Sequence, residues 1–183
     1  LNRYFILVII GMSYLVPFLE IYYQFGSSQV EGISDFTSMM LAIYTTIYVT
    51  ALTFVYTKKI AQETWPIIAL TAFIMLYLVV GIPAITSLRS DVFYAKEHIS
   101  LFLLHYISLP ALACIFYTII KNIKRLSKQA CTILGWLLVV CAVVILSVEL
   151  DNTIVQFWGT SDNYSDLLYD VRTFGYPILW GIL

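Results

Sequence analysis

Residues 99–149 read ISLFLLHYISLPALACIFYTIIKNIKRLSKQACTILGWLLVVCAVVILSVE, two uncharged runs joined by a basic link. A helix rises about 1.5 Å per residue and the hydrocarbon core of a bilayer is about 30 Å thick, so each run is long enough to cross once. The link KNIKRLSKQ carries four Lys or Arg residues and no acid. By the positive-inside rule, this transmembrane hairpin is predicted to turn in the cytoplasm.

The whole chain has the composition of a membrane protein. Of its 183 residues, 61% are hydrophobic and only 11% are charged, whereas charged residues make up about a quarter of a soluble domain. The sequence has no basic patch with interleaved aromatic residues, so nucleic acid is not an expected partner. The expected partners are membrane lipid and further helices of the same, longer protein.

Apolar runs also occur on both sides of the hairpin. Three of them precede it, at residues 4–25, 36–57 and 64–88, and a last run starts near Phe174. The sequence therefore predicts an all-α, polytopic transmembrane bundle with five full spans and the start of a sixth, in which residues 1–183 form a single region. Because the last run is too short to cross a bilayer and the first residue is not Met, we expect the chain to be part of a longer protein.

Charged residues are sorted between the two predicted sides of the membrane. Most Lys and Arg residues fall on the inner side, namely Arg3, Lys58, Lys59, Lys121, Lys124, Arg125 and Lys128. This distribution places the N-terminal end in the cytoplasm. Residues 150–172 are expected to form an acidic outer loop, with a short amphipathic helix around Asp162, Asp166 and Asp170.

Three ionisable side chains, Glu20, His105 and Glu149, lie within or at the ends of apolar runs, in the predicted outer half of the membrane. A charge at the centre of a membrane helix costs about 2.5–3.5 kcal/mol on insertion scales, so such residues are candidates for function. In one interpretation they form an outer polar pocket in which Glu20 and Glu149 hold a cation, a proton or a sugar hydroxyl and His105 transfers protons. In the other, the glutamates reach the headgroup region and His105 is neutral and hydrogen-bonded to a neighbouring helix.

The sequence predicts no cofactor, no metal site and no catalytic residue. His98 and His105 would lie about 10 Å apart on one helix, too far to ligate one zinc ion without distortion. Cys114, Cys131 and Cys141 lie inside apolar runs without metal-ligand spacing, as expected for packing residues. The sequence also lacks a Gly-rich phosphate loop, an HExxH motif and a nucleophile elbow.

The C-terminal quarter contains SVELDN, an expected outer loop and then VRTFGYPILWGIL. This part resembles a large bacterial family of hydrophobic, many-helix membrane proteins of unknown function. The resemblance implies a multi-pass protein of the bacterial cytoplasmic membrane, with more helices on both sides of this chain. It implies no catalytic residues.

Three functions are open on the sequence alone. The favoured one is a non-catalytic or transporter-like part of a larger multi-pass protein, because Pro17 and Pro110 predict kinked helices while catalytic motifs are lacking. The second is a membrane enzyme that acts on a lipid-linked or envelope glycan at the outer leaflet, suggested by acidic and aromatic outer loops. The third is a structural membrane scaffold.

Overall fold

The computed structural model describes residues 3–26, 33–95, 102–159 and 163–182, and these residues form helices and no strand. The long helices are α1 (Arg3–Gly26), α2 (Ile33–Val55), α4 (Trp65–Leu76), α5 (Ile82–Ala95), α7 (Ser108–Asn122) and α8 (Lys128–Trp158), and the short ones are α3 (Thr57–Ile60), α9 (Tyr164–Asp170) and α10 (Tyr176–Ile182). Two π-helical segments, η1 (Tyr77–Gly81) and η4 (Val171–Gly175), join α4 to α5 and α9 to α10. Two 3₁₀ segments, η2 (Leu103–Ile107) and η3 (Ile123–Arg125), flank α7. The predicted all-α class is confirmed.

Five helical stretches are long and apolar enough to cross a membrane: Tyr4–Phe25, Phe36–Val55, Trp65–Ser90, Leu103–Arg125 and Lys128–Trp158. They correspond to the five runs predicted from the sequence, so the polytopic helical bundle is confirmed. The last apolar run belongs to a helix that starts earlier than predicted, because α9, η4 and α10 follow one another without a break from Tyr164 to Ile182.

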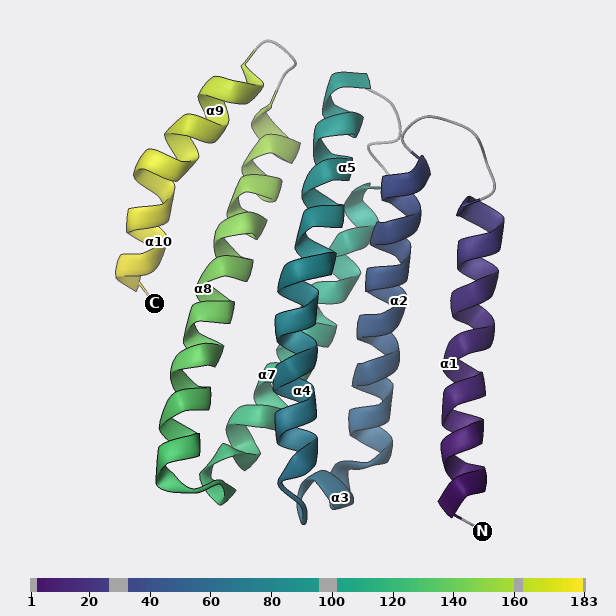
Figure 1. Cartoon of the computed structure of the whole chain (residues 1–183). Helices are drawn as coiled ribbons and strands as arrows, with labels where there is room; N and C mark the ends of the chain where they lie inside the picture. Colours follow the sequence, from purple (N-terminus) through teal and green to yellow (C-terminus); the bar gives the residue numbers. More distant parts are fainter. Residues whose placement is uncertain (1–2, 27–32, 96–101, 160–162, 183) are drawn as a thin grey trace.

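The basic links lie together at one end of the bundle. In Figure 1 the N-terminal end of α1, the α3 segment and the turn between α7 and α8 are all at the bottom, while the C-terminal ends of α1, α5 and α8 are at the top. The residues at the bottom include Lys58, Lys59, Lys121, Lys124, Arg125 and Lys128. We call this the basic end.

Two helices are longer than the thickness of a bilayer. At about 1.5 Å per residue, the 31 residues of α8 extend about 46 Å, against about 30 Å of hydrocarbon. The helix formed by α4, η1 and α5 runs to Ala95. The predicted ends of these helices near Leu88 and Val148 are therefore wrong: α5 continues to Ala95 and α8 to Trp158, so the start of the predicted outer loop is the last part of α8.

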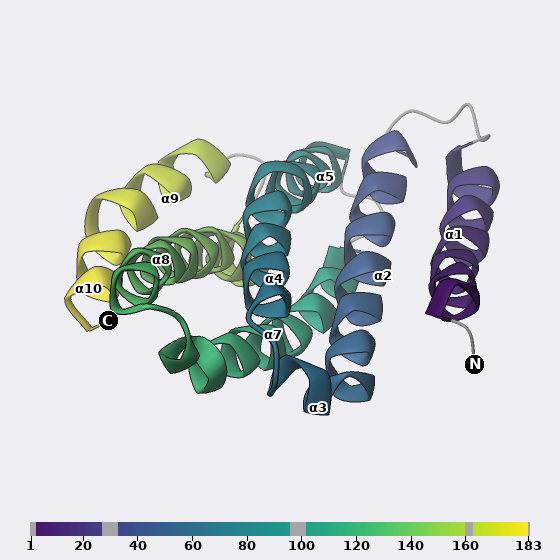
Figure 2. The ribbon, with the colours of Figure 1, turned by 60° about the horizontal axis from the view of Figure 1, so that its bottom comes forward.

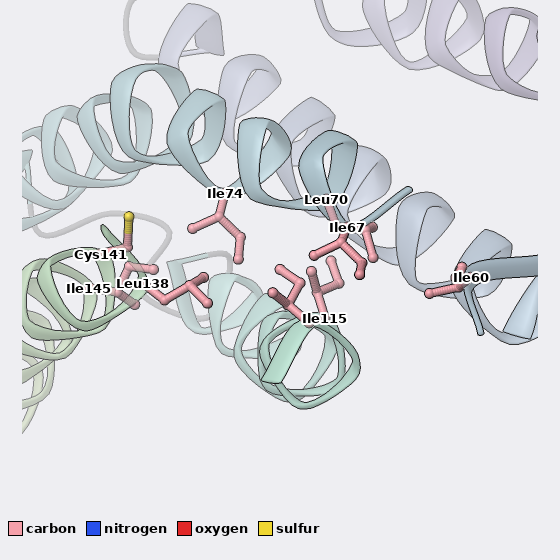
Figure 3. Close-up of a cluster of buried hydrophobic side chains, with 9 residues drawn as sticks. Ile60, Ile67, Leu70, Ile74, Ile115, Leu138, Cys141 and Ile145 are labelled. Atoms are coloured by element: carbon pink, nitrogen blue, oxygen red, sulfur yellow. The ribbon is translucent and has the colours of Figure 1, made fainter. Parts of the chain in front are cut away.

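An apolar core near the basic end joins α3, α4, α7 and α8 (Figure 3). Ile67, Ile74 and Ile115 have no exposed surface in this cluster. Their side chains point toward one another from two helices, α4 and α7, and Leu138 and Ile145 of α8 extend the cluster on one side. In a membrane, lipid tails are as apolar as these residues, so tight packing rather than burial from water stabilises the contact.

We expect Ile115→Ala to lower the free energy of unfolding by about 1–3 kcal/mol. Comparable substitutions in water-soluble cores cost about 2–5 kcal/mol, of which only the part due to the cavity should persist in lipid. Unfolding in mixed detergent micelles, followed by helical circular dichroism, measures the change. Ile120→Ala is the matched control because Ile120 is 58% exposed on the same helix; equal losses for both variants would contradict the packing argument.

Helix α1 packs on α2 through tyrosine and hydroxyl side chains. The Tyr48 hydroxyl lies 2.7 Å from the carbonyl oxygen of Ile10, and the Tyr14 hydroxyl lies 3.0 Å from Thr45 Oγ1. The Tyr14 and Tyr44 rings stack with their centroids 5.7 Å apart. Figure 2 shows α2 between α1 and the rest of the bundle, so α1 is a peripheral helix.

Candidate functional site: a buried polar cluster

Polar and charged side chains are buried together at the end opposite the basic end. We call Arg89, His105, Glu149, Asp151, Asn152 and Arg172 the polar cluster; all but Arg172 are buried. Counted from the basic end at about 1.5 Å per residue, Arg89 lies about 36 Å along α4–η1–α5 and Asp151 about 35 Å along α8. A hydrocarbon core about 30 Å thick that began at the first residues of these helices would end near the cluster, where the cost of burying charge is lower than at the centre.

His105 and Glu149 form a direct contact between two spanning helices. His105 Nε2 lies 3.1 Å from Glu149 Oε2, and the His105 side chain is 0% exposed and that of Glu149 10%. The other ring nitrogen, Nδ1, lies 2.5 Å from the carbonyl oxygen of Phe102. Because a carbonyl only accepts hydrogen bonds, Nδ1 must carry a hydrogen. A hydrogen bond between Nε2 and Oε2 then requires a second proton, on the imidazole or on the carboxyl group.

Irregular helical segments position this pair. His105 lies on η2, a 3₁₀ segment just before Pro110, where the sequence predicts a kink. The Ser108 hydroxyl donates to the carbonyl oxygen of His105 at 2.6 Å, which leaves it to accept from the Tyr77 hydroxyl at 3.0 Å. Tyr77 begins the π segment η1. Segment η2 thus places His105 against Glu149 of α8, and η1 places Tyr77 against Ser108 of α7.

Arg89, Asp151 and Arg172 form an ion-pair network beside His105–Glu149. Arg172 donates to Asp151 Oδ2 from Nε at 3.1 Å and from Nη2 at 3.0 Å. Arg89 Nη1 lies 3.9 Å from the same oxygen and donates to Asn152 Oδ1 at 2.9 Å. Burial alone lowers the pKa of Arg172, but its hydrogen bond to Asp151 and the charge of that carboxylate outweigh burial and raise this pKa above its ordinary value. The network ties α5 and η4 to α8.

Three buried atoms of this network have no hydrogen-bond partner among the described residues: Arg89 Nε, Asp151 Oδ1 and Asn152 Nδ2. Two are donors and one is an acceptor. Buried polar atoms without a partner each cost about 1–3 kcal/mol, so this part of the polar cluster is not optimised for stability alone.

Of the three side chains predicted to form a pocket, the structure brings together His105 and Glu149 and leaves Glu20 apart. Glu20 is exposed on α1, where its Oε1 accepts a hydrogen bond from Gln24 Nε2 at 2.5 Å. The helix that carries it packs on α2 and lies away from α7 and α8 (Figure 2).

Among the described residues, no group of three or more His, Cys, Asp or Glu side chains could hold a metal ion. Cys114, Cys131 and Cys141 are free thiols. His98 and Asp162 lie outside the described residues. Asp166 and Asp170 are exposed on α9, while Leu168 on the same helix is buried, as expected for an amphipathic helix. This helix is continuous with η4 and α10 along α8 (Figure 1).

Comparisons with protein families, curated proteins and solved structures found no match to this chain. The resemblance of its C-terminal quarter to a bacterial membrane-protein family therefore stays a prediction.

Sequence reasoning missed Arg89, Asp151 and Asn152 as site residues because it assigned them to outer loops. A signal was present for α8. The spacing of three and four residues that buries Leu138, Ile145 and Glu149 continues to Asn152 and Val155, which are also buried. Following this spacing past the hydrophobic run would have extended the helix and placed Asn152 beside Glu149. The same spacing in α5 buries Ile85, Leu88, Arg89 and Val92, so it also marks Arg89.

Proposed function

We propose that this chain is a transporter-like, non-catalytic part of a larger membrane protein, in which His105 and Glu149 bind and release a proton. The observation that carries this proposal is the 3.1 Å contact between His105 Nε2 and Glu149 Oε2. The other ring nitrogen, Nδ1, is hydrogen-bonded to the carbonyl oxygen of Phe102. An imidazole and a carboxylate in contact offer a proton two acceptors of different kind, which is a common arrangement in membrane proton relays.

The charges of the polar cluster favour proton exchange at this pair. With the shared proton present, the two arginines, the two acids and His105 sum to a formal charge of +1. Without it the sum is zero. Loss of the proton therefore removes an uncompensated positive charge from a buried site, while the attraction between His105 and Glu149 favours its return. Opposed effects of this kind allow a site to be both loaded and emptied.

The orientation follows from the basic end. We propose that this end faces the cytoplasm, because Lys and Arg residues concentrate there and the positive-inside rule relates such links to the cytoplasmic side. The polar cluster would then exchange its proton with the outer side of the membrane. A cytoplasmic membrane of a bacterium is the proposed location, as the resemblance implies.

Difference infrared spectroscopy on the full chain in lipid nanodiscs tests whether the pair holds a common proton. The carboxyl band of Glu149 is identified by its loss in Glu149→Gln. We expect His105→Gln to shift this band, because the shared proton loses its second acceptor. Glu20→Gln is the matched control, since Glu20 is exposed and lies on a different helix. An unchanged Glu149 band in His105→Gln would reject the shared proton.

Proton movement is tested in liposomes that contain the full chain and a trapped pH-sensitive dye. Under an imposed membrane potential we expect proton entry to be at least about tenfold slower for Glu149→Gln than for the unmodified chain or for Glu20→Gln, because transfer through the pair needs its carboxyl group. Equal rates for all three proteins would reject proton transfer. The polar cluster would then be a structural clasp that holds the outer ends of α5, α8 and η4 together.

A further inference from the structure

An apolar groove lies on the opposite half of the molecule from the polar cluster, between α1, α2 and α4. Its volume is about 510 Å³, and Lys59 and Ile60 of α3 line it toward the basic end. The groove exists because α1 is held against α2 by Tyr14, Tyr44 and Tyr48, while α2 separates α1 from α4 (Figure 2). Ile6 and Ile10 of α1 therefore face Leu70 and Phe73 of α4 across open space.

The lining of this groove is apolar over most of its length and includes a lysine at the basic end. The walls contributed by α1, α2 and α4 are almost entirely hydrocarbon and aromatic ring. At the basic end the lining includes Lys59, Tyr56 and Trp65. Tyr and Trp side chains of this kind are typical of the boundary between hydrocarbon and headgroups. The groove is therefore amphipathic, with an apolar body and a cationic mouth.

We propose that this groove binds one acidic phospholipid, with an acyl chain along the apolar walls and the headgroup phosphate at Lys59. Lys58 and Lys59 both lie on α3 and are exposed. The carboxylate of Glu63, in the same link, accepts a hydrogen bond from the Trp65 indole. Lys58, Lys59 and Glu63 together give this link a formal charge of +1. A second apolar helix would also fill the walls, but it would offer no charge complementary to the Lys59 ammonium. A phosphate at the end of an acyl chain neutralises it.

This inference does not depend on proton binding by His105 and Glu149, which lie at the other end of the bundle. Anionic lipids attract basic residues next to a membrane, each of which contributes enough to strengthen binding by about fivefold. Zwitterionic lipids with the same acyl chains would gain only the apolar contacts. Selectivity for the acidic lipid is therefore the expected property of the groove.

Native mass spectrometry of the delipidated full chain tests the site by titration with dioleoyl phosphatidylglycerol, dioleoyl phosphatidylcholine or inorganic phosphate. We expect the phosphatidylglycerol complex to form at about fivefold lower lipid concentration than the phosphatidylcholine complex. Lys59→Gln should remove this preference, whereas Lys124→Gln, which neutralises an exposed lysine elsewhere at the basic end, should keep it. Inorganic phosphate should bind weakly or not at all, because it lacks the chain.

Filling the groove provides the second arm of the test. Ala69 lines the groove and is exposed, so Ala69→Phe should occupy part of it without disturbing the core, and both lipids should bind less tightly. Ala72→Phe is the matched control, because Ala72 is exposed on the same helix but does not line the groove.

Three results would overturn the proposal. The first is equal lipid binding by Ala69→Phe and Ala72→Phe, which would mean that the headgroup binds without the groove. The second is an equal effect of Lys59→Gln and Lys124→Gln, which would mean a diffuse electrostatic attraction. The third is a change of oligomeric state in Ala69→Phe with lipid binding intact, which would mean that a second copy of the chain covers the groove.

Discussion

Replacing Asp151 with Asn should lower the free energy of unfolding by about 3–5 kcal/mol, the range measured when one partner of a buried ion pair is removed. The Asp151 side chain is 3% exposed and that of Arg89 is 6% exposed. Asn keeps the shape of the side chain and removes its charge, so Arg89 would remain buried with only the Asn152 oxygen as its partner. A buried guanidinium cannot release its proton to escape this cost.

Arg172 and Asp166 provide the comparisons. Arg172→Gln should cost about 1 kcal/mol or less, because the Arg172 side chain is 53% exposed and water can replace part of its interaction with Asp151. Asp166→Asn makes the same charge change at an exposed position on α9 and should leave stability almost unchanged. Unfolding in mixed micelles, followed by circular dichroism, ranks the three variants. A loss for Asp151→Asn no larger than that for Asp166→Asn would show that the network does not stabilise the fold.

The fold could be predicted because membrane spans depend on properties that a sequence displays directly. Length and apolar composition identify the five spans, and the basic links predict which turns share one end. Helix ends were less predictable. The polar residues after Leu88 and Val148 suggest loops, yet α5 and α8 continue because their backbone hydrogen bonds do not depend on lipid and because Arg89 and Asp151 compensate each other's charge. This compensation is a tertiary contact, which no local pattern in the sequence displays.

The candidate site was predictable only in part, for a similar reason. The cost of an ionisable group in an apolar run singles out Glu20, His105 and Glu149 one by one. Whether they meet depends on the order in which helices pack. His105 lies on η2, which leads into α7, and Glu149 lies on α8. The short basic link between α7 and α8 makes these two helices neighbours. Glu20 is on α1, whose tyrosine contacts with α2 place it at the edge of the bundle, and nothing in its own surroundings in the sequence distinguishes it from Glu149.

Replacing Gly81 with Ala should cost about 1–3 kcal/mol and disturb the hydrogen bond between Tyr77 and Ser108, because the added methyl group has no room. A Cβ atom at Gly81 would lie 2.8 Å from Cδ2 and 3.0 Å from Cε2 of the Tyr77 ring. This ring is 4% exposed and its hydroxyl lies 3.0 Å from Ser108 Oγ, so the ring cannot swing away without breaking a buried contact. Gly81 thus allows the π segment to bring Tyr77 to Ser108, which in turn donates to the carbonyl oxygen of His105.

A double-mutant cycle separates this steric effect from the general cost of changing a glycine in η1. Tyr77→Leu removes the ring and its hydroxyl, and in that background Gly81→Ala should cost at least about 1 kcal/mol less than it does alone, a coupling typical of residues in contact. Gly135→Ala is the control, since a Cβ there meets nothing within 4 Å, and it should be neutral or stabilising because Ala favours a helix over Gly. The same variants can be measured by infrared spectroscopy: a Gly81→Ala protein that shifts the Glu149 band would connect packing at η1 to the proton of His105 and Glu149. Equal costs of Gly81→Ala with and without the Tyr77 ring would rule out the close approach as the reason for glycine at this position.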